Sequence, residues 1–466
     1  MRKRDTESDR QRSPQPILKH RLPSGRGAME QPNATSDGET SLTPKFWLAV
    51  VLTGVATGLF GAALMAFLFE IQHLTFGYHV GDFQSAVARD SDMRRLAALM
   101  VAGVVGGVGW YLLGRFSKRS SQDLDDAVWN GSGELPVARS AINAVLSEVV
   151  IGMGASIGRE AAPRLMGGVS GSFLSGWLNL TPAQRRLLVA CGGGAGLAAV
   201  YNVPLGGALF TAEVLYGSLA LPSVLPALVC SFVATSVAWI YLPNSATYIK
   251  IPTYHFSTSL MIWSLIIGPI IGLLAIFYVR LIGWVSHNRA KGKWLLIMPF
   301  AAFVVLGLLS FKYPELLGNG KDAAHFAFLG EGGLMMLFAL FALKPLVTAM
   351  CLGSGASGGL FTPFLSTGAL VGGFFGLAWT HAWPGTPVGA FAMVGAAAMI
   401  GASMQAPLVG LALVLELTHS GFALMVPMMA ATAIATVLVR LVDGYSIYSA
   451  RLPRREILAA DGLASS

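Results

Sequence analysis

Charged residues are scarce in this sequence of 466 residues, in which Asp, Glu, Lys and Arg make up 12% against 54% hydrophobic residues. A water-soluble protein carries about twice that charged fraction. Cysteine is rare as well, and Cys191, Cys230 and Cys351 lie far apart in apolar stretches. That spacing indicates neither a disulfide framework nor a zinc site, and we expect no metal or cofactor. The composition excludes a soluble globular protein and predicts a chain embedded in a lipid bilayer.

The net charge of +8 does not predict a nucleic-acid partner, because much of the Lys and Arg lies before Lys45 and in short loops. This distribution follows the positive-inside rule and predicts a multi-pass membrane protein with a cytoplasmic N-terminus. Residues 1–44 contain no apolar run of a secretory signal and are predicted to be a disordered basic tail. We expect one transmembrane domain over residues 45–452 and a short tail over residues 453–466.

Long uncharged runs predict helices that cross the membrane, because about 20 apolar residues span roughly 30 Å of hydrocarbon. The run over 214–249 is predicted to form two passes broken near Pro222 or Pro226. The fold class is therefore an all-α polytopic membrane protein with many tilted and broken helices. The predicted spans are Phe46–Phe69, Leu96–Gly114, Leu187–Ala212, Val214–Ile249, Tyr254–Val279, Trp294–Phe311 and Leu417–Val439.

Residues 345–415 contain no Asp, Glu, Lys or Arg, and prolines and glycines interrupt them, which predicts several short, buried helices. Short motifs also recur about two hundred residues apart, which is typical of inverted-repeat transporters with a site at the bilayer midplane. We expect two inverted repeats, roughly 45–250 and 254–452. The recurring motifs are GAS (154–156) leading to Pro163, GAS (355–357) leading to Pro363, PLGG (204–207) followed by Glu213, and PLVG (407–410) followed by Glu416.

Two charges, Arg159 and Glu160, stand in the apolar, glycine-rich segment Gly158–Pro163. Buried charge is costly unless it is used or paired, so the segment is a candidate functional site. A glycine before a helix lets free N–H groups and the positive dipole end face an anion, without a fixed full positive charge. An ionised Glu160 could occupy that anion position and leave it when protonated, as a pH-sensitive gate. The structural alternative is an Arg159–Glu160 ion pair or a solvated loop end.

The corresponding segment of the second half, GASGGLFTP (355–363), is uncharged. We expect the backbone N–H groups of Leu360 and Phe361 to begin another helix there. Two opposed helix N-termini could then hold one dehydrated chloride. The alternative is a close crossing of two glycine-rich helices.

Three motifs in this order resemble the CLC family of chloride channels and exchangers. GREAAP (158–163) is similar to the signature GREGP, GGLFTP (358–363) is similar to GxFxP, and Tyr448 in SIYSAR (446–451) matches the pore tyrosine of that family. The segment GLAAVYNVPLGGALFTAEV (196–214) also resembles the CLC segment between the two signatures. The likeness covers roughly residues 45–452 and is closest to the short bacterial ClcB type, which has no C-terminal regulatory domain.

The resemblance implies a role for each candidate residue. Glu160 would be the external gating glutamate and Tyr448 the hydroxyl donor to the central chloride. Leu360 and Phe361 would be backbone N–H donors, and Gly158 and Arg159 belong to the first-half anion site. The resemblance also implies a homodimer with one separate pore per subunit. Chloride is then the transported ion, protons are the other candidate partner, and no enzymatic activity is expected.

Two positions depart from the family pattern. The family's first signature, GSGIP, supplies a serine to the inner chloride site, whereas this chain has the longer and acidic GSGELP at 131–136. Ser132 in that motif and Ser121 before it are both candidates. The number of residues between Ser121 and Glu160 is closer to the family's usual spacing, which favours Ser121. Family exchangers also have two adjacent acidic residues where this chain has Glu213 and Val214. Valine cannot titrate, so any proton path would need Glu213 or water, and Glu213 also fits a structural role.

The sequence therefore predicts a gated chloride channel, sensitive to voltage or pH, with a chloride/proton antiporter of the same fold as the alternative. A fluoride exporter is disfavoured by the chloride-type motifs. From another class, an intramembrane serine protease is a distant alternative, because GASG at 355–358 satisfies a GxSG pattern and His381 and His419 follow. That hypothesis leaves the repeats, the GRE motif and Tyr448 unexplained.

Overall fold

The computed structural model describes residues 42–78, 82–117, 123–129 and 131–452. The two predicted tails, apart from residues 42–44, and Ser121 lie outside the described residues. Within them, regular structure consists of helices and one isolated β-bridge. Eight of these helices are long and apolar enough to cross a membrane. The prediction of an all-α polytopic membrane protein is confirmed.

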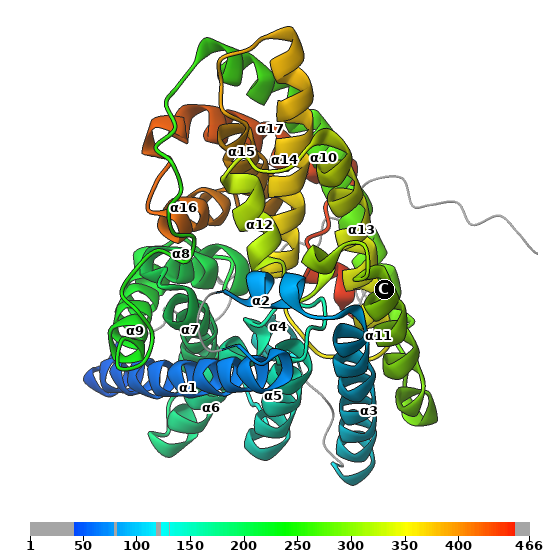
Figure 1. Ribbon diagram of the computed structural model, residues 1–466. Coiled ribbons are helices and arrows are strands. Elements are labelled where there is room, and N and C mark those ends of the chain that lie inside the picture. Colours follow the sequence, from blue (N-terminus) through cyan, green and yellow to red (C-terminus); the bar gives the residue numbers. More distant parts are fainter. Residues whose placement is uncertain (1–41, 79–81, 118–122, 130, 453–466) are drawn as a thin grey trace, which may run out of the picture.

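The first half of the chain, drawn blue to green, occupies the lower part of Figure 1. Its helix α1 is the longest and packs across α6, α7 and α9. The elements are α1 (Pro44–Phe76), α2 (Phe83–Arg89), α3 (Asp92–Phe116), α4 (Leu124–Trp129), α5 (Val137–Gly152), α6 (Ala161–Trp177), α7 (Pro182–Tyr201), α8 (Pro204–Leu209), the π-helical η1 (Phe210–Leu215) and α9 (Leu221–Ala238).

Most of the second half lies above the first, and α8 of the first half contacts α16 of the second (Figure 1). A further contact between the halves joins α3 to α11. The elements are α10 (Thr258–His287), η2 (Gly292–Leu296), α11 (Met298–Leu309), η3 (Pro314–Leu316), α12 (Lys321–Phe328), α13 (Leu334–Gly353), α14 (Phe361–Ala382), α15 (Val388–Met404), α16 (Pro407–Thr418), η4 (Phe422–Leu424), α17 (Met425–Val442) and η5 (Ser449–Arg451).

The starts of α1 and α7 are set by local capping. Thr43 precedes α1 and its side chain accepts a hydrogen bond from Phe46 N–H. Thr181 and Gln184 form a capping box at the start of α7, in which each side chain bonds the backbone N–H of the other. These caps satisfy N–H groups that have no partner within the helix. The local sequence thus determines where α7 begins, and α7 carries Tyr201 to the candidate site.

Two span predictions and part of the prediction for 345–415 differ from the structure, and each difference lies at a proline. The predicted span Leu187–Ala212 is broken, because α7 ends at Tyr201 and Pro204 begins the separate helix α8. The predicted break in 214–249 does not occur within α9, which includes Pro222 in its first turn and Pro226 further inside. In 345–415, α15 and α16 are short and largely buried, as expected, whereas α14 is a continuous helix of 22 residues because Pro363 lies in its first turn, where no N–H bond is lost.

Helices α6 and α7 are in backbone contact. Gly167 of α6 and Gly192 of α7 face each other so closely that a Cβ atom on either glycine would overlap the carbonyl oxygen of the other. Small residues allow such an approach, which maximises van der Waals contact where no hydrophobic effect drives helices together. The start of α6 is thereby held firmly against α7.

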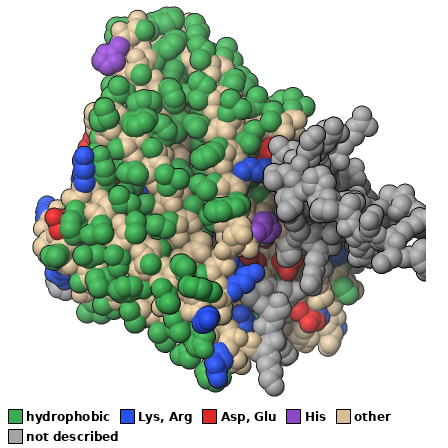
Figure 2. All heavy atoms as spheres, turned by 90° about the vertical axis from the view of Figure 1, so that its right-hand side faces the viewer, with side chains coloured by type: hydrophobic (Ala, Val, Ile, Leu, Met, Phe, Trp, Pro, Cys, Tyr) green, Lys and Arg blue, Asp and Glu red, His purple; other side chains and the backbone are tan. Residues whose placement is uncertain are grey.

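The outer surface is apolar. Figure 2 shows one face covered mostly by hydrophobic side chains, with Lys and Arg side chains toward its edges. Large apolar side chains such as Val104 of α3, Phe277 of α10 and Leu441 of α17 are exposed. Surfaces of this kind are stable in a lipid bilayer and not in water. The chain is a multi-pass membrane protein.

Candidate anion-binding site

The two glycine-rich segments meet at a pair of backbone hydrogen bonds. Gly158 N–H donates to Gly359 O at 2.8 Å, and Gly359 N–H donates to Gly158 O at 2.6 Å. This antiparallel bridge places the start of α6 beside the start of α14. The structure therefore brings together the two helix N-termini that the sequence analysis singled out, at the contact between the halves.

Glu160 is fully buried immediately before α6, with its carboxylate directed at the start of α14. Its Oε1 accepts a hydrogen bond from Phe361 N–H at 2.8 Å, and its Oε2 accepts from the hydroxyls of Thr362 and Tyr201, both at 3.3 Å. A Cβ atom at Gly158 or Gly359 would overlap this carboxylate, so both positions need glycine. The carboxylate is thus an anion held by the helix N-terminus and two hydroxyls.

Arg159 is buried against aromatic rings. Its guanidinium lies 5.1 Å from the ring centre of Tyr201 and 5.7 Å from that of Phe69. Both distances are within the range of favourable cation–π contact. This packing orients the arginine, and its anion-binding role stays a prediction.

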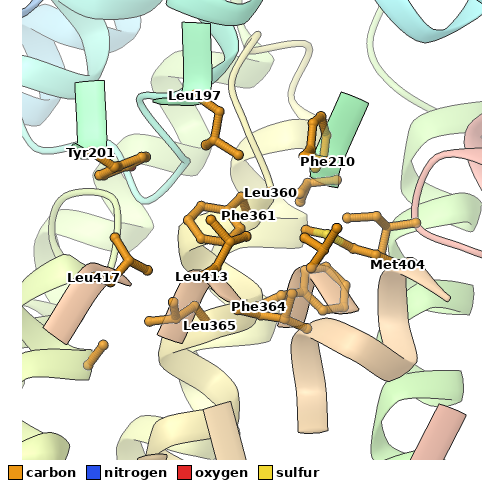
Figure 3. Packing of buried hydrophobic residues seen from close by; sticks show 14 of the residues in the cluster. Leu197, Tyr201, Phe210, Leu360, Phe361, Phe364, Leu365, Met404, Leu413 and Leu417 are labelled. Atoms are coloured by element: carbon orange, nitrogen blue, oxygen red, sulfur yellow. The ribbon is translucent and has the colours of Figure 1, made fainter. Parts of the chain in front are cut away.

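Leu360 and Phe361 are enclosed by apolar side chains. Figure 3 shows both residues among buried side chains that include Leu197 of α7 and Leu413 of α16. The ring of Phe361 packs on that of Tyr201 with 5.7 Å between centres. Because water is excluded, hydrogen bonds from the Phe361 backbone to an anion are strengthened.

A cavity of about 70 Å³ lies next to these helix starts. We call it the Tyr448 cavity, and its lining includes Tyr448, Leu360, Ser147, Arg164 and Arg451. A neighbouring cavity of about 240 Å³ shares Asp123, Asn143, Leu165 and Ser357 with it. The two cavities are therefore adjacent, and the smaller one reaches Ala161, next to Glu160.

The candidate serine Ser132 is not among the residues that line the Tyr448 cavity. Ser132 is exposed, and nearby Glu134 forms a surface ion pair with Arg185 at 2.6 Å. Ser121 lies outside the described residues. Among the described residues of the first half, Ser147 lines the Tyr448 cavity, and its hydroxyl donates to Ser357 O at 2.6 Å.

Glu213 and Glu416 make reciprocal contacts between the halves. Glu213 accepts hydrogen bonds from Leu408 and Val409 N–H at 3.3 and 2.9 Å, at the start of α16. Glu416 accepts from Leu205 and Gly206 N–H at 3.0 and 2.5 Å, at the start of α8. Each carboxylate caps the helix of the other half. This geometry favours the structural role that the sequence analysis considered for the pair.

The sequence analysis missed Arg164 and Glu148. Arg164 supplies a fixed positive charge to the Tyr448 cavity, although the sequence led us to expect a site without one. Glu148 of α5 is fully buried, and neither of its carboxyl oxygens has a hydrogen-bond partner among the described residues. The charged groups that act on it are Arg159 and Glu160. Both residues carry a charge within a long apolar stretch, and that signal could have identified them.

The environment of Ser357 does not favour the protease hypothesis. Its hydroxyl accepts a hydrogen bond from Asn143 Nδ2 at 3.1 Å. His381 and His419 are both exposed, at the ends of α14 and α16. A serine nucleophile needs a base within hydrogen-bond reach, and the hydroxyl is instead positioned by an amide.

Opposed helix N-termini that hold a buried carboxylate inside an apolar helix bundle define a membrane anion-transport protein. The chain matches the family described as "Voltage gated chloride channel" across residues 104–440 and belongs to that family, the CLC proteins. This confirms the resemblance drawn from the three motifs.

The chain is 28% identical over 424 residues to the "H(+)/Cl(-) exchange transporter ClcA" of Yersinia pestis, covering 87% of both chains. It is also 28% identical over 415 residues to the "Voltage-gated ClC-type chloride channel ClcB" of Salmonella typhi, covering 86% of this chain and 97% of the relative. A slow cyanobacterial Cl⁻/H⁺ antiporter has the same fold, with a TM-score of 0.76, 24% identity and coverage of 91% and 100%. A CLC-type fluoride/proton antiporter gives a TM-score of 0.71 at 19% identity, covering 87% and 97%.

Proposed function

We propose that this protein exchanges chloride for protons across a membrane. The observation that carries the proposal is the Glu160 carboxylate, which occupies an anion position on the N-terminus of α14 through Phe361 N–H. Relatives named as H⁺/Cl⁻ exchange transporters support coupling to protons. This is the alternative of the sequence analysis, and it is better supported than the gated channel.

The geometry supplies a coupling mechanism. While ionised, the Glu160 carboxylate competes with chloride for Phe361 N–H and for the hydroxyls of Thr362 and Tyr201. Protonation removes its negative charge and weakens these hydrogen bonds, so the side chain leaves and chloride takes the donors. Glu160 thus either carries a proton and leaves the site to chloride, or is ionised and occupies the site itself. This alternation couples the movement of chloride to the movement of protons in the opposite direction.

The channel alternative rested on Val214, which cannot carry a proton. Glu213 is engaged at the start of α16 and is poorly placed to move. Glu148 offers another protonatable group, because it is buried, without a hydrogen-bond partner among the described residues, and influenced by Arg159 and Glu160. An unpaired carboxyl in such surroundings is stabilised by taking up a proton. We therefore assign proton transfer to Glu148 and Glu160 within the exchange proposal.

Location and assembly follow the same proposal. We place the protein in the bacterial inner membrane with its N-terminus in the cytoplasm, as the excess of Lys and Arg before Lys45 supports. We also propose a homodimer with one anion route per subunit. Chemical cross-linking in membranes tests the dimer, and protease protection of an N-terminal tag tests the topology.

Reconstituted proteoliposomes test the exchange itself. With a chloride gradient and a potassium ionophore present, we expect proton uptake against its own gradient. Chloride flux without proton movement would establish a channel instead. Fluoride flux in the absence of chloride flux would contradict the proposed substrate.

Glu148→Gln is expected to lower proton transport at least about tenfold while chloride efflux continues, because glutamine cannot carry a proton. The measurement is simultaneous recording of both ions in the same vesicles. Glu70→Gln is the matched control, since Glu70 is exposed on α1. Unchanged coupling in Glu148→Gln would remove Glu148 from the proton route and leave exchange by Glu160 intact.

A further inference from the structure

Arg164 is a buried cation beside the predicted chloride ligand Tyr448. It lies in the first turn of α6, and its guanidinium packs on the rings of Phe210 at 4.5 Å and Tyr448 at 5.2 Å. One nitrogen, Nη1, donates to the Tyr448 hydroxyl at 3.5 Å, and the other, Nη2, donates to Asp125 Oδ1 at 3.1 Å. Its Nε has no hydrogen-bond partner among the described residues.

Arg451 of η5 pairs with a second aspartate at the same cavity. Its Nη2 lies 3.6 Å from Oδ2 of Asp123, just before α4. Both arginines and both aspartates line the Tyr448 cavity. One short segment, 123–125, therefore directs two carboxylates at the two guanidinium groups of the cavity.

These groups are suited to an anion. A guanidinium binds any anion that reaches its N–H groups, and a carboxylate and a halide compete for the same donors. Because the Tyr448 oxygen accepts from Arg164, its own O–H hydrogen is free to donate elsewhere. The volume of about 70 Å³ exceeds the roughly 10–15 Å³ that one water-sized particle needs.

We propose that Arg164 is an anion-binding group of the Tyr448 cavity and that a halide competes with the Asp125 carboxylate for it. In this structure the Asp125 carboxylate occupies the Arg164 guanidinium, just as the Glu160 carboxylate accepts the hydrogen bond of Phe361 N–H. Two carboxylates thus occupy anion donors in this region, Asp125 at Arg164 and Glu160 at Phe361 N–H. This proposal does not depend on whether protons are exchanged.

A fixed structural ion pair is the competing explanation, and the two predict different responses to anions. Removing one partner of a buried pair leaves an uncompensated charge and destabilises the protein. If the pair is only structural, that loss is the same in any salt. If Arg164 binds anions, chloride replaces the missing carboxylate and restores stability.

Asp125→Asn is therefore the decisive variant. In purified protein we expect it to bind chloride about tenfold more tightly by calorimetry, since the competitor is neutral and the arginine stays. Its unfolding temperature should be lowered in gluconate and recover as chloride is added. The double variant Asp125→Asn/Arg164→Gln should lose both the gain in affinity and the recovery.

Glu134→Gln is the matched control, because it makes the same change in the surface pair with Arg185 and should leave chloride affinity unchanged. Equal destabilisation of Asp125→Asn in chloride and gluconate, with unchanged affinity, would overturn the proposal. If Asp125→Asn cannot be purified, crystals of the natural protein grown in bromide test whether a halide binds at Arg164. We expect anomalous density for bromide within hydrogen-bond distance of the Arg164 guanidinium, and an intact Arg164–Asp125 pair without it would refute the site.

Discussion

Glu160→Ala is expected to transport chloride at all pH values while proton transport falls to the background of empty vesicles. The carboxylate that now accepts from Phe361 N–H, Thr362 and Tyr201 would be missing, so chloride could take these donors without waiting for a proton. We expect the loss of proton coupling to exceed about a hundredfold, because the group removed is itself the competitor for the site. Chloride efflux measured from about pH 4 to pH 8 gives the pH profile.

Two comparisons sharpen this experiment. Glu160→Gln keeps the shape of a protonated glutamate and should also abolish proton transport, whereas Glu70→Gln on the surface should behave as the natural protein. If Glu160→Ala kept the natural pH dependence, the gating assignment would be wrong. If it carried no chloride although correctly folded, Glu160 would be needed for anion binding itself.

Gly192→Leu is expected to prevent folding into a homogeneous protein. A Cβ atom at this position already overlaps the carbonyl oxygen of Gly167, so a leucine would force α6 and α7 apart along their whole contact. Overpacking a core side chain costs about 1–3 kcal/mol, and a clash with the backbone of α6 exceeds that range. The measurement is size-exclusion chromatography of detergent extracts, with the elution profile detected by the fluorescence of a fused reporter.

Gly176→Leu on the same helix pair is the control, because a Cβ atom there would have no other atom within 4 Å and the residue is exposed. It should elute as the natural protein does. A normal elution profile for Gly192→Leu would mean that α6 and α7 can separate without loss of the fold. The start of α6, and with it Glu160, would then be less firmly held than the packing indicates.

Five uncharged runs were correctly predicted as membrane helices and correspond to α1, α3, α10, α11 and α17. The sequence analysis did not predict α13 or the full length of α14. The errors occur at prolines, because the effect of a proline depends on its place within a helix. Pro204 begins a helix and Pro226 lies inside one, and apolar composition alone does not distinguish the two cases.

The candidate site was predicted in part. Glu160, Phe361 and Tyr448 were identified by motif, and the structure places the first two in direct contact. Arg164 and Glu148 were missed because their importance depends on burial and on partners that are distant in sequence. Asp125 is 39 residues from Arg164 and Tyr448 is 284 residues away, so only the folded chain reveals this cluster.

The reciprocal caps of Glu213 and Glu416 bear on how the chain is made. Helix α8 begins at Pro204, but the carboxylate that caps it is about 210 residues further along the chain. At about 5–20 residues per second, a ribosome needs roughly 10 to 40 seconds to supply it. Until Glu416 has been made, the start of α8 lacks this cap. The native start of α8 therefore depends on a residue that is translated late in the second half.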